Sequence, residues 1–129
     1  MSVPDTGQGA ARRLYAAAMS TGPTPFRLDG EVAENLAAAC DKLVDDLGAV
    51  IARGHLVTDV TGFPDLPTGH ALTAGFGGKG MEYLDLLRSF QETALLFKAA
   101  YLAAGKRFAD ADAANQAALN LIAQHLETP

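Results

Sequence analysis

"MEYLDLLRSFQETALLFKAAYLAAGKRFADADAANQAALNLIAQHL", residues 81–126, is the stretch that decides the fold of this chain. It contains no proline and a single glycine, Gly105, so little in it opposes a helix. Residues at alternating steps of four and three form one stripe along it, and nearly all are apolar: Tyr83, Leu87, Phe90, Ala94, Phe97, Tyr101, Ala104, Phe108, Ala111, Asn115, Ala118 and Ile122. A seven-residue repeat of this length predicts a long helix over 81–126 with coiled-coil-like packing.

The large side chains of this region concentrate on that stripe, which makes it the candidate surface for association with another helix. Side chains four and seven residues apart lie on one face of a helix, so the rings and aliphatic groups are presented together. We therefore expect a helix-association stripe with these members: Tyr83, Leu87, Phe90, Phe97, Tyr101, Phe108 and Ile122.

Two more helices are predicted upstream. Residues 8–20 carry apolar side chains at helical spacing and end at a segment with glycine and proline, which predicts a short N-terminal helix. Asp29 suits the N-cap of a first long helix over 31–57, and Glu31 suits its first turn. Apolar residues at helical spacing form the predicted core of that helix: Val32, Leu36, Leu43, Leu47 and Val50.

Residues 58–80 separate the two long helices. The segment 58–69, "TDVTGFPDLPTG", is a loop by its glycine and proline content. Residues 70–80 hold four glycines close together, and each interior glycine costs a helix about 1 kcal/mol relative to alanine. The chain thus predicts an all-α fold in one domain, residues 1–129. The architecture is an elongated antiparallel helical hairpin or bundle with a short N-terminal helix and a Gly-rich joint between the long helices.

The two long helices predicted here differ in length. At 1.5 Å per residue, 81–126 would span about 69 Å and 31–57 about 40 Å, so the shorter helix cannot cover the longer one. The N-terminal helix, a bend at Gly105, or a second chain would cover the rest of the stripe. We expect association, because an uncovered stripe ending in Phe108 and Ile122 would be an exposed apolar patch. Whether the partner is a second copy or another chain stays open.

Composition and charge exclude several classes of partner. Ten Lys and Arg against fifteen Asp and Glu give a net charge of −5, and the basic residues are scattered. Nucleic acid and anionic membranes are therefore not expected partners. The apolar stretch 14–19, which follows Arg12 and Arg13, is too short for a signal peptide, and no stretch is long enough to span a membrane. The lone cysteine, Cys40, excludes an internal disulfide.

No catalytic, cofactor or metal site is recognisable in the sequence. Residues 75–80, "GFGGKG", match the G-x-G-x-x-G dinucleotide loop in form, but no strand precedes them and the acidic partner residue is missing. His55, His70 and His125 are widely separated, whereas a zinc site needs several converging ligands. No serine has a histidine placed to activate it. We expect neither enzymatic activity nor a cofactor.

Residues 100–119, "AYLAAGKRFADADAANQAAL", resemble the C-terminal helix of small actinobacterial proteins of the type VII (ESX) secretion system. Over residues 29–122 the chain is similar to the WXG-type helical hairpins and their longer EspC-like relatives, including "FPDLPTGHALTAGFGGKG" at 63–80. The resemblance implies a secretion motif, an aromatic residue followed four positions later by an acid, at Phe108 and Asp112. The chain has no tryptophan, and phenylalanine stands where the family usually has tyrosine.

The motif has two interpretations. Residues four apart share a helical face, so the Phe108 ring and the Asp112 carboxylate form a composite patch that a receptor can read. Alternatively, Phe108 is the next core position of the stripe and Asp112 is merely solvated. Both interpretations stay open from the sequence.

The resemblance implies a non-enzymatic protein that associates with itself or with a related small helical protein. It also implies export by type VII machinery, from the cytoplasm to the cell surface or the medium, by a route that needs no signal peptide. The alternative is a cytosolic helical adaptor or chaperone for a toxin or effector. Such an adaptor would use the same stripe without being exported.

Overall fold

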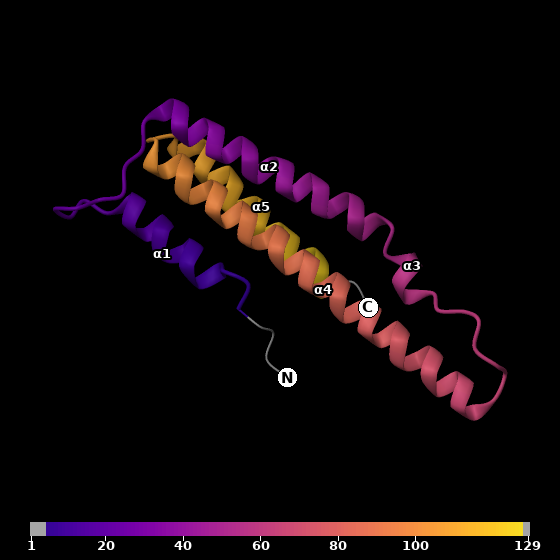
Figure 1. Cartoon of the computed structure of the whole chain (residues 1–129). Helices are drawn as coiled ribbons and strands as arrows, with labels where there is room; N and C mark the ends of the chain where they lie inside the picture. The colour runs from indigo at the N-terminus through magenta and orange to yellow at the C-terminus, as the bar shows by residue number, and fades with distance from the viewer. Residues whose placement is uncertain (1–4, 128–129) are drawn as a thin grey trace.

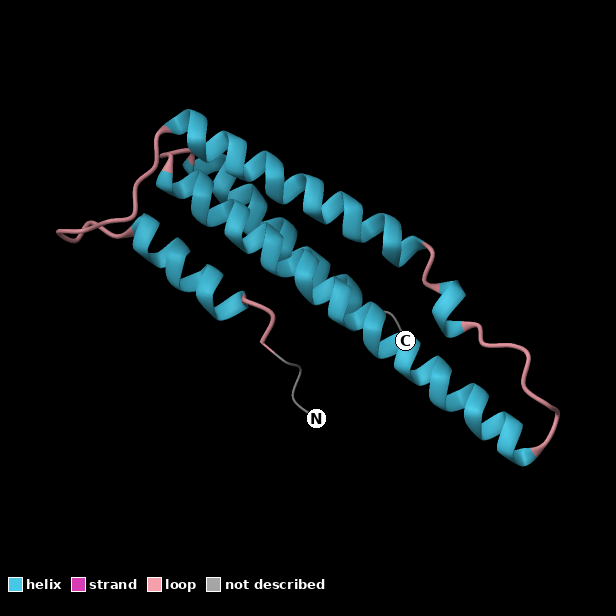
Figure 2. Ribbon diagram, in the orientation of Figure 1, coloured by secondary structure: helices cyan, strands magenta, loops and turns pink. Residues whose placement is uncertain are grey.

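The computed structural model describes residues 5–127 and holds only helices, with no strand, in that range. The helices are α1 (Gln8–Met19), α2 (Gly30–Ala52), the single-turn α3 (His55–Thr58), α4 (Pro67–Ala104) and α5 (Phe108–Glu127). Figures 1 and 2 show α2 and α5 running antiparallel to α4, with α1 beside the C-terminal half of α4. The predicted all-α hairpin or bundle with a short N-terminal helix is confirmed.

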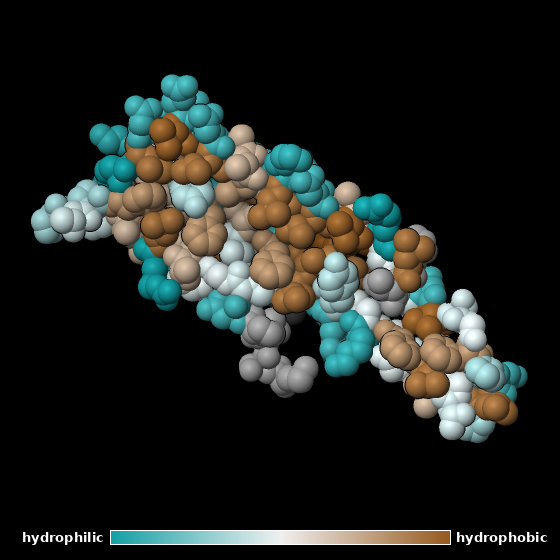
Figure 3. Space-filling view, in the orientation of Figure 1, coloured by the Kyte–Doolittle hydropathy of each residue, from teal (hydrophilic) through white to brown (hydrophobic). Residues whose placement is uncertain are grey.

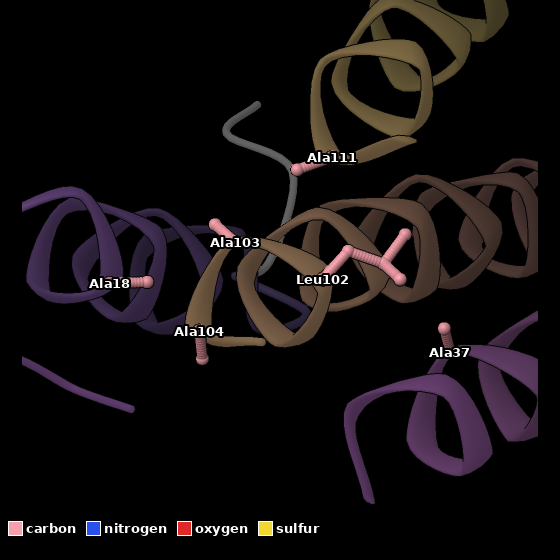
Figure 4. Close-up of a cluster of buried hydrophobic side chains, with 6 residues drawn as sticks. All are labelled: Ala18, Ala37, Leu102, Ala103, Ala104 and Ala111. Atoms are coloured by element: carbon pink, nitrogen blue, oxygen red, sulfur yellow. The ribbon is translucent and has the colours of Figure 1, made fainter. Parts of the chain in front are cut away.

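Helix α4 is the centre of the molecule, because α1, α2, α3 and α5 all pack against it and hardly against one another. One buried cluster gathers side chains from four helices (Figure 4): Ala18, Ala37, Leu102, Ala103, Ala104 and Ala111. Apart from four leucines, the buried apolar side chains that the structure describes are all alanines. Alanines let helices approach closely but bury little area each, so the leucines supply much of the hydrophobic stabilisation.

The prediction of a single helix over 81–126 is wrong, since α4 and α5 are two antiparallel helices (Figure 1). The reversal is a Schellman motif: the Arg107 amide donates to the Leu102 carbonyl at 2.8 Å, and the Lys106 amide donates to the Ala103 carbonyl at 3.0 Å. Lys106 has a φ of 62°, the left-handed conformation that glycine usually supplies at this position. A lysine there gives no signal in the sequence.

Gly105 precedes this left-handed position and serves another purpose. Its φ is −86°, which any residue adopts. A Cβ at Gly105 would lie 2.5 Å from the Cβ of Ala33 on α2, so glycine allows α2 and α4 to approach each other here. Of the three possibilities for covering the stripe, the chain uses two: a bend near Gly105, in the form of a complete reversal, and the N-terminal helix, which packs on α4 beside Phe97.

The predicted loop and Gly-rich joint over 58–80 is wrong for most of its length, because α4 begins at Pro67 and continues through every glycine of the joint. Proline suits the first turn of a helix, where the amide has no helical partner. Two glycines let the preceding loop lie against α4. A Cβ at Gly69 would overlap the Pro64 carbonyl oxygen, and one at Gly77 would lie 3.2 Å from a carbonyl oxygen of α3. Glycine at these two positions thus permits close packing on α4, although glycine disfavours the helix itself.

The first long helix, predicted over 31–57, begins as expected and ends early. The Asp29 carboxylate accepts a hydrogen bond from the Glu31 amide at 2.9 Å, so the predicted N-cap is confirmed. The chain turns at Gly54, where a Cβ would lie 2.5 Å from the Leu84 side chain of α4. The close approach of the chain to α4 at Gly54 therefore ends α2 at Ala52, although the apolar periodicity in the sequence predicted a helix to residue 57.

We expect Asp29→Ala to lower the free energy of unfolding by about 1 kcal/mol, because the Glu31 amide loses its acceptor. Asp29→Asn keeps a side-chain oxygen and should unfold at nearly the wild-type urea concentration. Urea titration followed by circular dichroism measures both variants. An equal loss in the asparagine variant would mean that the charge of Asp29, and not its hydrogen bond, stabilises the helix start.

The predicted core of the first helix is wrong in register. Helix α2 buries Ala33 and Ala37 against α4. The predicted core residues lie beside this buried face. Val32, Leu43 and Val50 are exposed, and Leu36 and Leu47 are half-buried. The physical reason is that small side chains let α2 lie close to the alanine-rich surface of α4, where the larger ones would hold the two helices apart.

Candidate functional site

Helix α2 carries an apolar flank next to the face that it buries. Successive residues of a helix are rotated by about 100°, so Val32 lies to one side of the buried Ala33 and Glu34 to the other. Glu34 and Asp41 line a groove toward α5. The side away from that groove carries the apolar flank: Val32, Leu36, Leu43, Leu47 and Val50. Leu43, in its middle, is 49% exposed.

Aromatic residues of α4 lie between α1 and α2. The Phe97 and Tyr101 rings stack with their centroids 6.0 Å apart. Phe97 packs against a buried cluster that includes Ala11 of α1. Burial, and then the neighbouring Cys40 of α2, raise the pKa of the Tyr101 hydroxyl. About two turns before Phe97 on the same helix, Phe90 is 41% exposed.

The flank of α2 and the rings of α4 together form one surface, which we call the apolar face. Figure 3 shows apolar side chains gathered along α2 and α4 on the visible side of the molecule. Large exposed apolar patches are uncommon on monomers, so this surface is a candidate contact with another molecule. The apolar face has these members: Val32, Leu36, Leu43, Leu47, Val50, Phe90, Phe97 and Tyr101.

The structure divides the predicted helix-association stripe among different surroundings. Leu87 is buried within the chain, whereas Tyr83 remains exposed on α4. Phe108 and Ile122 lie on α5 and do not continue the surface of α4. The prediction that these residues form one continuous stripe is therefore wrong, because the reversal after α4 removes its last third.

The Phe108–Asp112 pair lies at the start of α5, immediately after the reversal. The Phe108 side chain is 47% exposed, so it is not a core residue of this chain, and Asp112 is exposed one turn later. Asp110, between them, lines the groove toward α2 and thus faces another direction. An ion pair of 2.6 Å between Arg107 and Glu34 ties the reversal to α2. The ring and the Asp112 carboxylate are presented on a fixed helix end.

A groove between α2 and α5 has Lys98 and Leu102 of α4 at its base. The Lys98 ammonium lies 2.8 Å from the Asp41 carboxylate, and Arg107 pairs with Glu34 at one end of the groove. These pairs offset most of the negative charge of the groove. Burial, and then Asp41, raise the pKa of the nearby Cys40 thiol, with Lys98 opposing them. A thiol with a raised pKa is a poor nucleophile at neutral pH.

A second apolar surface lies at the far end of the molecule, and we call it the tip pocket. It is an open hollow of about 500 Å³. The Phe63 and Phe76 rings stack there, with centroids 5.7 Å apart and planes 8° from parallel. The following residues line it: Val60, Phe63, Phe76, Lys79, Gly80 and Tyr83. The tip pocket was not predicted, because 58–80 was expected to be a loop and a Gly-rich joint. The spacing of Phe76, Lys79 and Tyr83 on one helical face was the available signal.

The described residues contain no group of three or more His, Cys, Asp and Glu side chains that could hold a metal ion. His70 Nε2 lies 2.6 Å from Asp65 Oδ1, and both side chains are exposed. The side chains of His55 and His125 lie outside the described part of the chain. Residues 75–80 are helical and so do not form the turn by which a dinucleotide loop holds phosphates.

Comparison of the chain with protein-family models, with curated proteins and with solved structures finds no match. Of the helices that the structure describes, none combines the length and hydropathy needed to cross a membrane. Three surface features of this chain are candidates for a function: the apolar face, the Phe108–Asp112 pair and the tip pocket.

Proposed function

We propose that this protein is a non-enzymatic helical partner protein of the type VII (ESX) secretion class, exported and acting through helix–helix association. The observation that carries the proposal is the apolar face. Its large apolar side chains remain partly exposed to solvent, whereas the neighbouring alanines are buried in the core. Association with a partner would transfer these side chains from water into an interface, which is the main favourable term in most protein association.

The shape of the apolar face favours a helical partner. Its side chains stand on α2 and α4, which lie antiparallel and in contact along most of α2 (Figure 1). Rows of side chains at helical spacing form ridges into which the ridges of other helices pack, as in four-helix bundles. The partner is a second copy or a related small helical protein that presents a similar pair of helices.

The position of the Phe108–Asp112 pair supports the export part of the proposal. An exposed ring and carboxylate on a helix end are accessible to a receptor without unfolding the bundle. Phenylalanine has no hydroxyl group, so recognition would rest on ring packing and on hydrogen bonds to the charged Asp112. Export of this kind needs no signal peptide and would take the protein from the cytoplasm to the cell surface or the medium.

We expect Asp112→Ala to abolish export while the fold is retained, because the Asp112 side chain is exposed. The measurement is the amount of protein in culture filtrate and in cells of an actinobacterial host with type VII machinery. Asp110→Ala is the matched control, since it removes a carboxylate of the same helix that faces the groove. Circular dichroism checks that both variants keep their helices.

Two outcomes would change the proposal. Export of Asp112→Ala at the wild-type level would show that this pair is not the secretion motif. Retention of the wild-type protein in cells, together with association through the apolar face, would favour the cytosolic adaptor or chaperone.

A further inference from the structure

The tip pocket is an apolar hollow with a positive charge at its edge. Phe63 is 37% and Phe76 56% exposed, so a third ring would have two aromatic surfaces to pack against. Lys79 and Tyr83 lie on the same face of α4 as Phe76. The Lys79 ammonium lies 3.3 Å from the Glu82 carboxylate, but both side chains are largely exposed, so this ion pair is weak and easily replaced.

The other end of the molecule presents the complementary chemistry. Phe108 offers a half-exposed ring, and Asp112 offers a carboxylate one turn further along α5. Phe76 and Lys79 are also about one turn apart on α4. If α5 of one copy lies alongside α4 of another, a single alignment places the Phe108 ring against the Phe76 ring and the Asp112 carboxylate against the Lys79 ammonium. Figure 1 shows the start of α5 and the start of α4 at opposite ends of the molecule, so the contact cannot form within one chain.

We propose that the tip pocket of one copy receives Phe108 and Asp112 of a second copy. The ring packs into the hollow beside Phe63 and Phe76, and the carboxylate pairs with Lys79. A second copy is the partner because it carries a ring and an acid at the matching spacing on an exposed helix end. The inference goes beyond the proposed function, since it concerns contacts between purified copies and needs neither export nor the apolar face.

The geometry sets how this association behaves. Two different surfaces meet in the contact, so copies add head to tail without closing into a defined dimer. The contact is small, and we expect its dissociation constant between about 10 µM and 1 mM. Salt weakens it, because an exposed ion pair is screened. Association through the apolar face has no ion pair at its centre and should respond little to salt.

Light scattering of the full chain at increasing concentration tests the proposal. Lys79→Glu and Asp112→Lys should each weaken head-to-tail association about tenfold or more, because two like charges then face each other. The double variant Lys79→Glu/Asp112→Lys should restore association, because opposite charges again face each other. An equal mixture of the two single variants should also restore it. Misfolded single variants cannot produce that result, so the mixture guards against a failure to fold.

Asp110→Lys is the matched control, because it makes the same charge change two positions earlier on another side of α5. It should associate like the wild type. The proposal is overturned if the wild-type mass does not rise with concentration, or if Asp110→Lys weakens association as much as Asp112→Lys does. It is also overturned if neither the double variant nor the mixture restores association. Each of these results leaves the export experiment unaffected, because that experiment measures culture filtrate.

Discussion

Leu43→Lys is expected to remove association through the apolar face while leaving the helices folded. Leu43 lies at the middle of the flank on α2 and is already 49% exposed, so a lysine there disturbs no buried contact of the chain. In an interface, however, the charge would have to be buried without a partner, which costs several kcal/mol. At high salt, which screens the head-to-tail contact, size exclusion with light scattering should show monomer mass for the variant at concentrations where the wild type is associated.

Ala49→Lys provides the control for this experiment. Ala49 is exposed on the same helix but lies outside the apolar flank, so its variant should keep the wild-type mass. Both proteins should give the wild-type circular dichroism spectrum. A wild-type chain that stays monomeric at all concentrations would contradict the proposed association. A Leu43→Lys variant that stays associated at high salt would place the interface elsewhere.

Leu102→Ala is expected to cause the largest loss of stability. Leu102 is 5% exposed and belongs to the buried cluster whose other members are alanines (Figure 4), with Tyr15, Phe26 and Leu28 packed against its edge. Alanines cannot move into the space that the side chain leaves, so a cavity remains, and the loss should be about 3–5 kcal/mol. Thermal unfolding should shift downward by roughly 10–20 °C in a domain of this size. Differential scanning calorimetry measures the shift.

Leu119→Ala is the matched substitution for stability. Leu119 lies on α5 and is largely exposed, so its removal should change the unfolding temperature by only a few degrees. If Leu102→Ala were no more destabilising than Leu119→Ala, the alanine-rich cluster around Leu102 would not be the core of the bundle.

The reversal after α4 shows why parts of the fold were not predictable from periodicity. The four-and-three pattern continues from Tyr101 through Phe108 without a break, because α5 also needs an apolar face to pack on α4. The left-handed residue of the turn is Lys106, whereas a sequence analysis looks for glycine there. The glycine that is present, Gly105, leaves room for Ala33 of α2 to approach α4 closely. No local sequence pattern shows this contact.

In the Gly-rich segment a helix is present where the sequence predicted a break. Propensity predicts that glycines at 75–80 interrupt a helix, yet α4 passes through them. The Pro64 carbonyl of the loop lies against Gly69 and the Thr58 carbonyl of α3 lies against Gly77, so these two glycines admit close neighbours that only the folded chain supplies. The sequence could indicate only the helical side of the tip pocket, because Phe63 and Phe76 come from a loop and a helix that meet only in the folded chain.

By itself the sequence determined the helical class, the short N-terminal helix and the Asp29 cap. These follow from local periodicity and hydrogen bonding, which a few neighbouring residues decide. Only the tertiary structure decided which side of each helix is buried. Alanines such as Ala33 and Ala37 permit the closest approach of α2 to α4, so they form the core, and the larger side chains that periodicity marks as core remain on the surface.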